Sequence, residues 1–414
     1  MKIVHLSYSD SQGGAARAAY RIHQSLIKNG LQSKMWVNDA KTGDQTVKGP
    51  INKRQKLLNL LYPHLINNSL VKMHKTQNKI IHSPSVFSSA WVKYINESDA
   101  DIVHLHWIQN EMISISDIPK IKKSIVWTLH DMWAFCGAEH LTHDNRWREG
   151  YKKNNRPIYD TGFDLNRWTW KRKLRKWKKP IQIVAPSKWL ANCVLESKLM
   201  AQWPVSVISN PLDTDSFKPI SKKIAREQLN LPQDVSLMLF GAISGSKSHN
   251  KGFDLLSNAL NKIDESLLDK KLKLIIFGEQ KKDVPPDIKF PIHYMGHLQD
   301  DISLRLLYSA ADIMVVPSRI EAFGQTASEA QACATPVVSF DNSGLTDIVD
   351  HKKTGYLAKA LDVNDLTNGI TWVLNNHKLL NLGDKSREQA VKKFSEKIIA
   401  KHYFDIYDKV LKPL

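Results

Sequence analysis

Two glutamates, Glu321 and Glu329, stand eight positions apart beside a candidate anion site, and such a pair of carboxylates needs an explanation. The first follows a short apolar run, residues 313–316, that reads as a buried parallel strand. The second lies on the helix expected next, whose first residues would offer free amides to an anion. A sugar nucleotide fits this pattern, because its diphosphate accepts from amides while its hydroxyls donate to carboxylates. Without its neighbours, the segment reads equally well as a solvated helix with two unrelated glutamates.

A lysine-containing loop adds to this candidate site. It covers residues 243–252 and follows Gly241, which comes at the end of an expected strand. Lys251 or Lys247 could neutralise a departing diphosphate, because a lysine ammonium is a compact positive charge. Taken alone, this is a routine surface loop. The residues expected around the ligand are Gly241, Lys247, Lys251, Phe323, Gly324, Gln325 and Glu329, with Glu321 as a catalytic candidate.

Two features of the N-terminal half also fall just after expected strands. Gly13 and Gly14 open a helix, which suits a ligand at the helix N-terminus or a plain tight turn. They do not fit the dinucleotide pattern G-x-G-x-x-G, so a nicotinamide or flavin enzyme is not supported. His130 follows the strand expected over residues 125–129, on the side where catalytic residues of parallel sheets gather. It could hydrogen-bond a sugar hydroxyl, or it could be a structural residue at a strand end.

Metal and disulfide chemistry is not expected. His104 and His106 alternate along one strand, but no third and fourth ligand follows at short spacing. The three cysteines, Cys136, Cys193 and Cys333, are odd in number and widely spaced, which is typical of a reducing cytoplasm. No segment reads as a signal peptide or a membrane span.

The elements that must position these residues alternate between strand and helix in both halves of the 414-residue chain. This alternation predicts an α/β fold with two domains, each a parallel sheet covered by helices, and a ligand site in the cleft between them. We expect an N-terminal domain over residues 1–208, a C-terminal domain over 209–393, and a last helical segment, 394–414, crossing back to the first domain. The helical pattern itself begins earlier, because the sequence from about residue 386 to 411 reads as one helix.

The charge points to an anionic partner. A net charge of +18 suits phosphates, an anionic membrane or nucleic acid, and no nucleic-acid motif is present. The segment 146–179 is basic and rich in tryptophan, a combination that suits a membrane interface. Alternatively, its tryptophans pack on the domain itself.

Taken together, these motifs resemble the retaining glycosyltransferases of family 4, the group 1 transferases with the two-domain GT-B fold. The resemblance covers nearly the whole chain and is strongest in the glutamate pair with the segment 330–338 behind it. Other matching strings are 210–219 at the interdomain join, 251–256 as the donor loop and 354–357 as a late turn, together with His130, Gly13 and Gly14. The strings 128–133 and 185–190 are most similar to bacterial exopolysaccharide and O-antigen transferases.

The resemblance implies transfer of a sugar from a UDP- or GDP-sugar, with retained anomeric configuration and without a metal or other cofactor. Glu329 would hold the ribose and Glu321 the donor sugar, while Lys251 and the amides near Gly324 would stabilise the departing diphosphate. His130 would contact the sugar from the opposite domain. A lipid-linked acceptor, a role in surface polysaccharide synthesis and a place at the inner face of the cytoplasmic membrane would follow.

One departure from the family pattern bears on the phosphate site. Many relatives have an arginine where this sequence has Ala242, so Lys247 would replace it or Lys251 would act alone. Two alternatives stay open: a nucleotide-sugar epimerase or hydrolase of the same architecture, and a catalytically weakened sugar-nucleotide binding protein.

Overall fold

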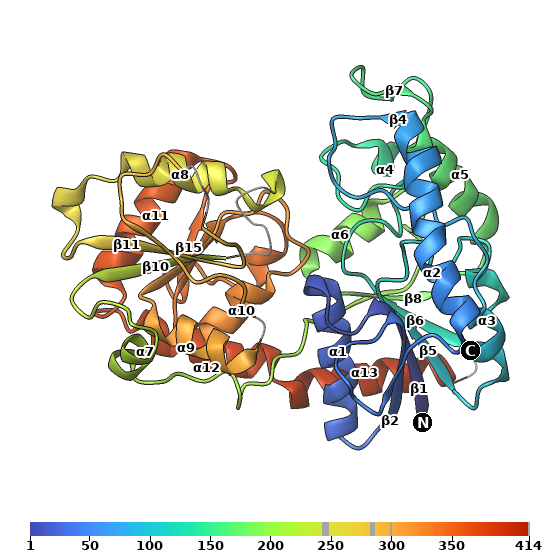
Figure 1. Ribbon diagram of the computed structural model, residues 1–414, viewed down its shortest axis with the longest axis horizontal. Coiled ribbons are helices and arrows are strands. Elements are labelled where there is room, and N and C mark those ends of the chain that lie inside the picture. Colours follow the sequence, from blue (N-terminus) through green and yellow to red (C-terminus); the bar gives the residue numbers. More distant parts are fainter. Residues whose placement is uncertain (242–247, 282–285, 299, 413–414) are drawn as a thin grey trace. The chain divides into compact units, whose positions relative to one another are not determined.

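The computed structural model describes residues 1–241, 248–281, 286–298 and 300–412 (Figure 1). The chain divides into two compact units. Unit 1 comprises Met1–Ile208 with Ile399–Leu414, and unit 2 comprises Ser209–Ile398. Each unit is built on a parallel sheet with helices packed on it, so the predicted α/β fold class is confirmed.

Unit 1 has a parallel sheet with the strand order β3-β2-β1-β5-β6-β8-β9. The strands are β1 (Lys2–Ser9), β2 (Gln32–Asp39), β3 (Val47–Lys48), β5 (Ile102–Leu105), β6 (Ser124–Thr128), β8 (Gln182–Ala185) and β9 (Val205–Val207). A separate antiparallel pair joins β4 (His74–Lys75) to β7 (Thr161–Gly162). The strand order reverses between β1 and β5, and such a reversal leaves a crevice at the carboxyl ends of the two strands.

The helices of unit 1 include the last helix of the chain. They are α1 (Gly13–Lys28), α2 (Lys53–Ile66), α3 (Trp91–Glu97), α4 (Arg146–Glu149), α5 (Leu165–Lys176), α6 (Lys188–Glu196) and α13 (Glu396–Leu411). Tyr403 and Tyr407 of α13 are fully buried in one apolar cluster with β1, β5, β6 and β8. The C-terminal helix therefore completes the core of the N-terminal sheet, as predicted.

Unit 2 has a parallel sheet in the order β12-β11-β10-β13-β14-β15. Its strands are β10 (Ser236–Gly241), β11 (Leu272–Phe277), β12 (Ile292–Tyr294), β13 (Ile313–Val316), β14 (Val337–Phe340) and β15 (Gly355–Ala358). Its helices are α7 (Lys222–Gln228), α8 (Phe253–Lys262), α9 (Asp301–Ala310), α10 (Gln325–Ala332), α11 (Val363–Asn376) and α12 (Leu382–Phe394). The order reverses here too, between β10 and β13.

Both faces of the unit 2 sheet are buried. Along β13, Met314 and Val316 belong to one apolar cluster, whereas Ile313 and Val315 belong to the other. Successive side chains of a strand point to opposite faces, so a strand covered on both sides needs the continuous apolar run seen in the sequence. Helices lie on both sides of this sheet (Figure 1).

The expected single helix over residues 386–411 is wrong. The chain breaks at Ser395, whose backbone is extended (φ −57°, ψ 141°), between α12 and α13. Phe394 and Ile399 lie on either side of the break and pack in different cores. One straight helix could not fill both, and periodicity alone does not reveal such a bend.

Among the described residues, no helix is both long and apolar enough to cross a lipid bilayer.

The packing of α13 yields a first prediction. Tyr403 is fully buried, and its hydroxyl lies 2.9 Å from the Thr128 hydroxyl oxygen. Tyr403→Ala should lower the free energy of unfolding of unit 1 by about 3–5 kcal/mol, as aromatic truncations in cores do. Urea unfolding followed by tryptophan fluorescence measures this, because every tryptophan except Trp372 lies in unit 1. The neighbouring exposed Phe404→Ala should cost less than about 1 kcal/mol. Equal losses would mean that α13 does not belong to the unit 1 core.

Candidate functional site

The glutamate loop and the lysine loop of unit 2 meet at the point where the strand order reverses. The lysine loop follows β10, and the glutamate loop follows the neighbouring strand β13. The Nζ atom of Lys251 donates to Glu321 Oε2 at 2.7 Å. Both side chains are partly exposed, so a ligand can reach them. The structure thus brings together two residues that stand 70 positions apart in the sequence.

Hydrogen bonds to the backbone hold these two loops together. Asn250 donates from Nδ2 to the Ile320 carbonyl oxygen at 2.8 Å, and Arg319 N donates to the Asn250 carbonyl oxygen at 2.8 Å. Gly252 has a left-handed backbone (φ 67°), and a Cβ atom there would lie 1.9 Å from the Pro317 carbonyl oxygen. No other residue type fits so close to that carbonyl, which explains the glycine after Lys251.

Two further contacts support the loops, and sequence reasoning missed them. Arg319 forms a bidentate ion pair with Asp254, at 2.9 and 2.6 Å. Glu321 N donates to Ser343 Oγ at 3.1 Å, and Gly344 N donates to the Glu321 carbonyl oxygen at 2.7 Å. The loop after β14 therefore fixes the backbone of Glu321. Asp254 and the serine carry no spacing signal that would have identified them.

Glu329 lies inside unit 2 rather than on its surface. It occupies the middle of α10, is 3% exposed, and accepts a hydrogen bond from the Tyr308 hydroxyl at 2.8 Å. The solvated helix that the sequence left open is therefore wrong for this residue. A buried carboxylate is costly unless it is hydrogen-bonded, so Glu329 has at least a structural role with Tyr308.

In the turn before α10, the backbone is available to a ligand, whereas the side chain of Phe323 is not. Gly324 has a left-handed backbone (φ 108°) and immediately precedes the helix, and a Cβ atom there would lie 2.6 Å from Leu345 Cδ2. Phe323 is buried against Phe394, so only its backbone amide could serve a ligand. Gln325 is the first helical residue, and its side-chain amide nitrogen is buried without a hydrogen-bond partner among the described residues.

The other residues that we expected around the ligand of unit 2 fall into two groups. Gly241 is explained by packing, because a Cβ atom there would lie 2.1 Å from the Phe277 ring. The close approach that this glycine permits is thus to a side chain of the protein. Lys247 and Ala242 lie outside the described residues.

Unit 1 has a pocket at its own reversal of strand order. A cavity of about 330 Å³ lies between the end of β1, the start of α1 and the chain after β5. Gly13 and Gly14 line it, and a Cβ atom at either position would meet nothing within 4 Å. The first turn of α1 contains no acidic residue, and Gln12 caps it without a side-chain hydrogen bond. The helix dipole therefore favours an anion there.

His130 stands at the same carboxyl edge of the sheet, just after β6. Its Nε2 atom lies 3.1 Å from His106 Nδ1. Next to it, Asp131 accepts from Trp107 Nε1 at 2.9 Å, and Trp107 also lines the cavity. Burial lowers the pKa of His130 to about 4, although Asp131 opposes the shift. His130 is therefore neutral at pH 7.

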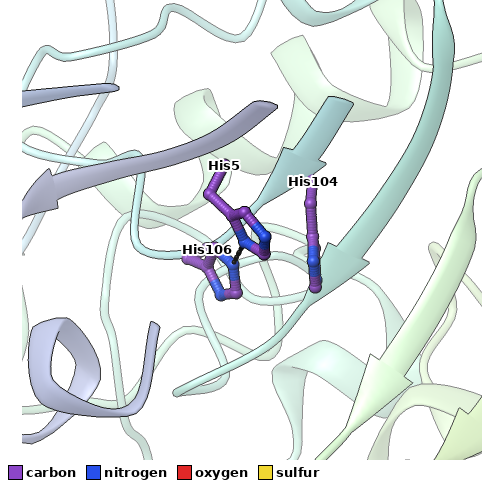
Figure 2. Close-up of side chains that lie close together, drawn as sticks. All are labelled: His5, His104 and His106. Atoms are coloured by element: carbon purple, nitrogen blue, oxygen red, sulfur yellow. Dashed lines mark hydrogen bonds between the residues drawn. The ribbon is translucent and has the colours of Figure 1, made fainter. Parts of the chain in front are cut away.

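A histidine cluster lies beneath His130, and the sequence revealed only part of it. His5 of β1 joins His104 and His106, and each offers a ring nitrogen within 4.8 Å of the others (Figure 2). The observed contacts are hydrogen bonds. His104 bonds the hydroxyls of Tyr407 and Thr128, both at 2.7 Å. Parallel register places His5 beside His104, and only the sheet order reveals that pairing.

The basic, tryptophan-rich segment is largely internal. Trp147, Trp170 and Trp177 are buried. Lys173 is buried as well, where its Nζ atom donates to backbone carbonyls, including Gly137 O at 2.7 Å, and lies 3.7 Å from the centroid of the Trp133 ring. Burial lowers the pKa of Lys173 to about 7. These buried tryptophans are therefore not the lipid anchors that the sequence suggested, and the alternative of packing on the domain holds for them. Exposed lysines and arginines remain on this segment.

Comparison with known proteins gives two family matches. Residues 221–393 match the model described as "Glycosyl transferases group 1", and residues 12–216 match the model described as "Glycosyltransferase Family 4". The two matches together cover most of the chain.

Curated relatives match this chain in part. It is 30% identical over 225 residues to D-inositol 3-phosphate glycosyltransferase 2 of Catenulispora acidiphila, covering 51% of this chain and 52% of that one. It is 26% identical over 238 residues to lipopolysaccharide 1,2-N-acetylglucosaminetransferase of Salmonella typhimurium, covering 54% and 60%. It is 30% identical over 151 residues to N,N'-diacetylbacillosaminyl-diphospho-undecaprenol alpha-1,3-N-acetylgalactosaminyltransferase of Campylobacter jejuni, covering 35% and 39%. The aligned segments thus span roughly half of these relatives.

Solved structures share the fold over the whole chain. Sucrose-phosphate synthase of Thermosynechococcus elongatus superposes with a TM-score of 0.68 at 17% identity, covering 99% of each chain. HepE of Anabaena, solved in complex with UDP and glucose, has a TM-score of 0.65 at 17% identity, covering 99% of this chain and 100% of that one. These likenesses show the fold.

The histidine cluster predicts a pH-dependent stability. Burial, the largest cause in each case, lowers the pKa of His23 and His130 to about 4 and that of His5, His104 and His106 well below 6.5. Below pH 6.5 the unfolded chain binds protons that the folded chain does not. The free energy of unfolding of unit 1 should therefore fall as the pH drops from 6.5 towards 4, by up to ~1.4 kcal/mol per pH unit for each group.

Urea unfolding at pH 7 and pH 5 measures this loss. His23→Gln should make it smaller, whereas the exposed His402→Gln should leave it unchanged. Equal stability at both pH values would contradict the burial of neutral histidines.

Proposed function

The chain belongs to the group 1 glycosyltransferases of family 4, and we propose that it transfers a sugar from a nucleotide-sugar donor to a glycan acceptor with retained anomeric configuration. The observation that carries the proposal is the Lys251–Glu321 pair, held beside the N-terminus of α10 where the strand order of unit 2 reverses. A positive charge, a carboxylate and free amides at one sheet edge match a diphosphate that bears a sugar.

The roles of Lys251 and Glu321 follow from their chemistry and their partial exposure. Lys251 and the amides of the turn at Gly324 bind the diphosphate and stabilise the charge that develops as it departs. When the diphosphate binds, Lys251 pairs with it instead of with Glu321. Glu321 then accepts hydrogen bonds from hydroxyls of the donor sugar. The family resemblance alone assigns the ribose hydroxyls to Glu329, because its side chain is 3% exposed and hydrogen-bonded to Tyr308. No metal or other cofactor is needed, since the ammonium and the amides already supply positive charge.

Unit 1 supplies the binding site for the acceptor substrate. Gly13 and Gly14 open a pocket at a helix N-terminus that suits a phosphate of the substrate. His130, neutral and at the same sheet edge, hydrogen-bonds a substrate hydroxyl.

A lipid-linked acceptor in bacterial surface polysaccharide synthesis is the specific role that we propose. Two of the relatives support it, because their names give lipopolysaccharide and a diphospho-undecaprenol as their substrates. The donor is a UDP- or GDP-sugar, and a UDP complex of a structural neighbour favours the first.

Donor turnover tests the proposal. Nucleotide release from a panel of UDP- and GDP-sugars, with a polyprenyl-diphosphate sugar as acceptor, should require both substrates. Glu321→Gln and Lys251→Ala should each lower kcat/KM by about 10²–10³, as loss of one electrostatic contact to a transition state does. A chelator should have no effect, and the product should keep the anomeric configuration of the donor.

Glu265→Gln, on the exposed surface of the same unit, serves as the control and should retain full activity. Release that needs no acceptor would indicate a hydrolase, and binding without release would indicate a weakened binding protein. Unchanged turnover in both site variants would refute the assignment of the site.

Access to a lipid-linked acceptor calls for a surface that meets the membrane, and we place it on α2. This helix buries only Gln55 and Ile66. Four leucines on it are exposed, namely Leu57 (56%), Leu60 (67%), Leu61 (42%) and Leu65 (51%). Their spacing of three, four and eight residues puts them on one face of the helix. An exposed apolar stripe of this kind is typical of a helix that lies in a membrane interface.

The positive charge around α2 favours binding of this helix to an anionic lipid surface. From residue 45 to residue 96 the sequence contains no aspartate or glutamate but eight lysines and arginines. Lys53, Arg54 and Lys56 lie on α2 itself, and all three are exposed. Each basic residue near an anionic leaflet contributes about 1 kcal/mol of attraction. The enzyme is thus peripheral to the inner face of the cytoplasmic membrane, and the exposed lysines of α5 add to the attraction.

Vesicle sedimentation tests this surface. The protein should bind vesicles that contain phosphatidylglycerol, and binding should weaken as salt is added. The triple variant Leu57→Ser, Leu60→Ser, Leu61→Ser should bind at least about tenfold more weakly, because each leucine loses its apolar transfer energy. The matched variant Ile302→Ser with Leu379→Ser removes exposed apolar residues of unit 2 and should bind normally. Equal binding by both variants would exclude α2 as the membrane surface.

A further inference from the structure

Three histidines of unit 1 form a hydrogen-bonded chain that ends at His130. The first link joins His130 Nε2 to His106 Nδ1 at 3.1 Å. The second joins His106 Nε2 to His5 Nδ1 at 2.8 Å (Figure 2). The inner two rings are fully buried, and His5 Nε2 has no hydrogen-bond partner among the described residues. His130 is partly exposed at the sheet edge, so this histidine chain has one open end there and one closed end in the core.

The two links couple the tautomers of all three rings. A neutral imidazole carries one proton, so each ring in the chain donates through one nitrogen and accepts through the other. Burial lowers the pKa of all three side chains, which keeps them neutral at pH 7. Only two arrangements satisfy both links: every ring protonated on Nδ1, or every ring protonated on Nε2.

The closed end distinguishes these arrangements. If all rings carry the proton on Nε2, His5 has a buried N–H group without an acceptor. If all carry it on Nδ1, His5 has a lone pair without a donor. Either atom costs desolvation energy when it is left unpaired, but among buried backbone groups orphaned N–H donors are rarer than orphaned acceptors. The Nδ1-protonated arrangement is therefore favoured, although imidazole in water slightly prefers the proton on Nε2.

We propose that His106, backed by His5 in the core, is a positioning residue that holds His130 in the Nδ1-protonated tautomer. The nitrogen of His130 that is not tied to His106 then presents a hydrogen-bond donor, which is complementary to the oxygen lone pair of a substrate hydroxyl. That last consequence rests on the proposed function, whereas the tautomer itself does not.

A buried metal site is the competing explanation for this cluster. His5, His104 and His106 could each offer one nitrogen to an ion. However, both nitrogens of His104 already hydrogen-bond hydroxyl groups, and the 2.8 Å between His5 Nδ1 and His106 Nε2 is a hydrogen-bond distance. The contacts in the structure favour the proton chain.

Nitrogen NMR of ¹⁵N-histidine-labelled protein, without substrate, tests the proposal. Long-range proton–nitrogen correlations show which ring nitrogen carries the proton, and the His130 signals are assigned by their loss in His130→Gln. In the wild type, we expect His130 to be protonated on Nδ1. His106→Phe should shift it towards the Nε2 form.

Substitution of His5 tests the closed-end argument itself, because His5 does not bond His130 directly. In His5→Phe the buried nitrogen without a partner becomes His106 Nε2, so the same argument keeps His106 protonated on Nδ1 and His130 in the Nδ1 form. Tyr407→Phe removes a hydroxyl bonded to His104, which is not part of the hydrogen-bonded histidine chain. This variant should leave the tautomer of His130 unchanged. Thermal unfolding of each variant verifies that it is folded.

Three outcomes would overturn the proposal. The first is a wild-type His130 protonated on Nε2. The second is a His130 tautomer that does not respond to His106→Phe in the folded protein. The third is stoichiometric metal in the purified protein whose removal changes the signals of His5 and His106. Each can occur whether or not the protein transfers sugars, so failure here is distinct from failure of the proposed function.

Discussion

The reversal of strand order in each parallel sheet is the constraint on which the candidate sites depend. Strands covered on both faces bury their side chains, so polar chemistry collects at the carboxyl edge. Where neighbouring strands send their connections to opposite faces, that edge opens into a crevice. In unit 1 this point lies between β1 and β5, and the cavity at Gly13 occupies it. In unit 2 it lies between β10 and β13, where Lys251 meets Glu321.

Close contact between backbones makes the unit 2 site rigid. Gly252 lets the lysine loop touch the carbonyl of Pro317, and Gly344 lets the loop after β14 touch the carbonyl of Ala322. The Asn250 side chain, which donates to the Ile320 carbonyl oxygen and accepts from Ile320 N, then fixes the register of the two loops. An ion pair between two partly exposed groups is weak by itself. Here it is the backbone scaffold that sets the position of the lysine and the glutamate.

Unit 1 follows a different rule, because part of its interior is polar. Histidines from two neighbouring strand segments lie with their rings in contact, and hydroxyl groups or other histidines satisfy most of their nitrogens. The buried Lys173 is likewise satisfied by backbone carbonyls. Such groups are tolerated inside a protein only when they are hydrogen-bonded and, for histidine, uncharged. The polar interior links the stability of unit 1 to pH and links the core to His130 at the sheet edge.

The sequence by itself determined the fold class, most strand positions and the family, because continuous apolar runs and the Glu321–Glu329 spacing are local patterns. Only the tertiary structure decided which residues meet. The break at Ser395 depends on two separate cores, the burial of Glu329 on its packing with Tyr308, and the histidine chain on the parallel register of β1 and β5. In the sequence, the leucines of α2 look like ordinary core residues. Only the structure shows that they are exposed. Periodicity describes one element at a time, whereas contacts between elements depend on sheet order and register, which no local pattern records.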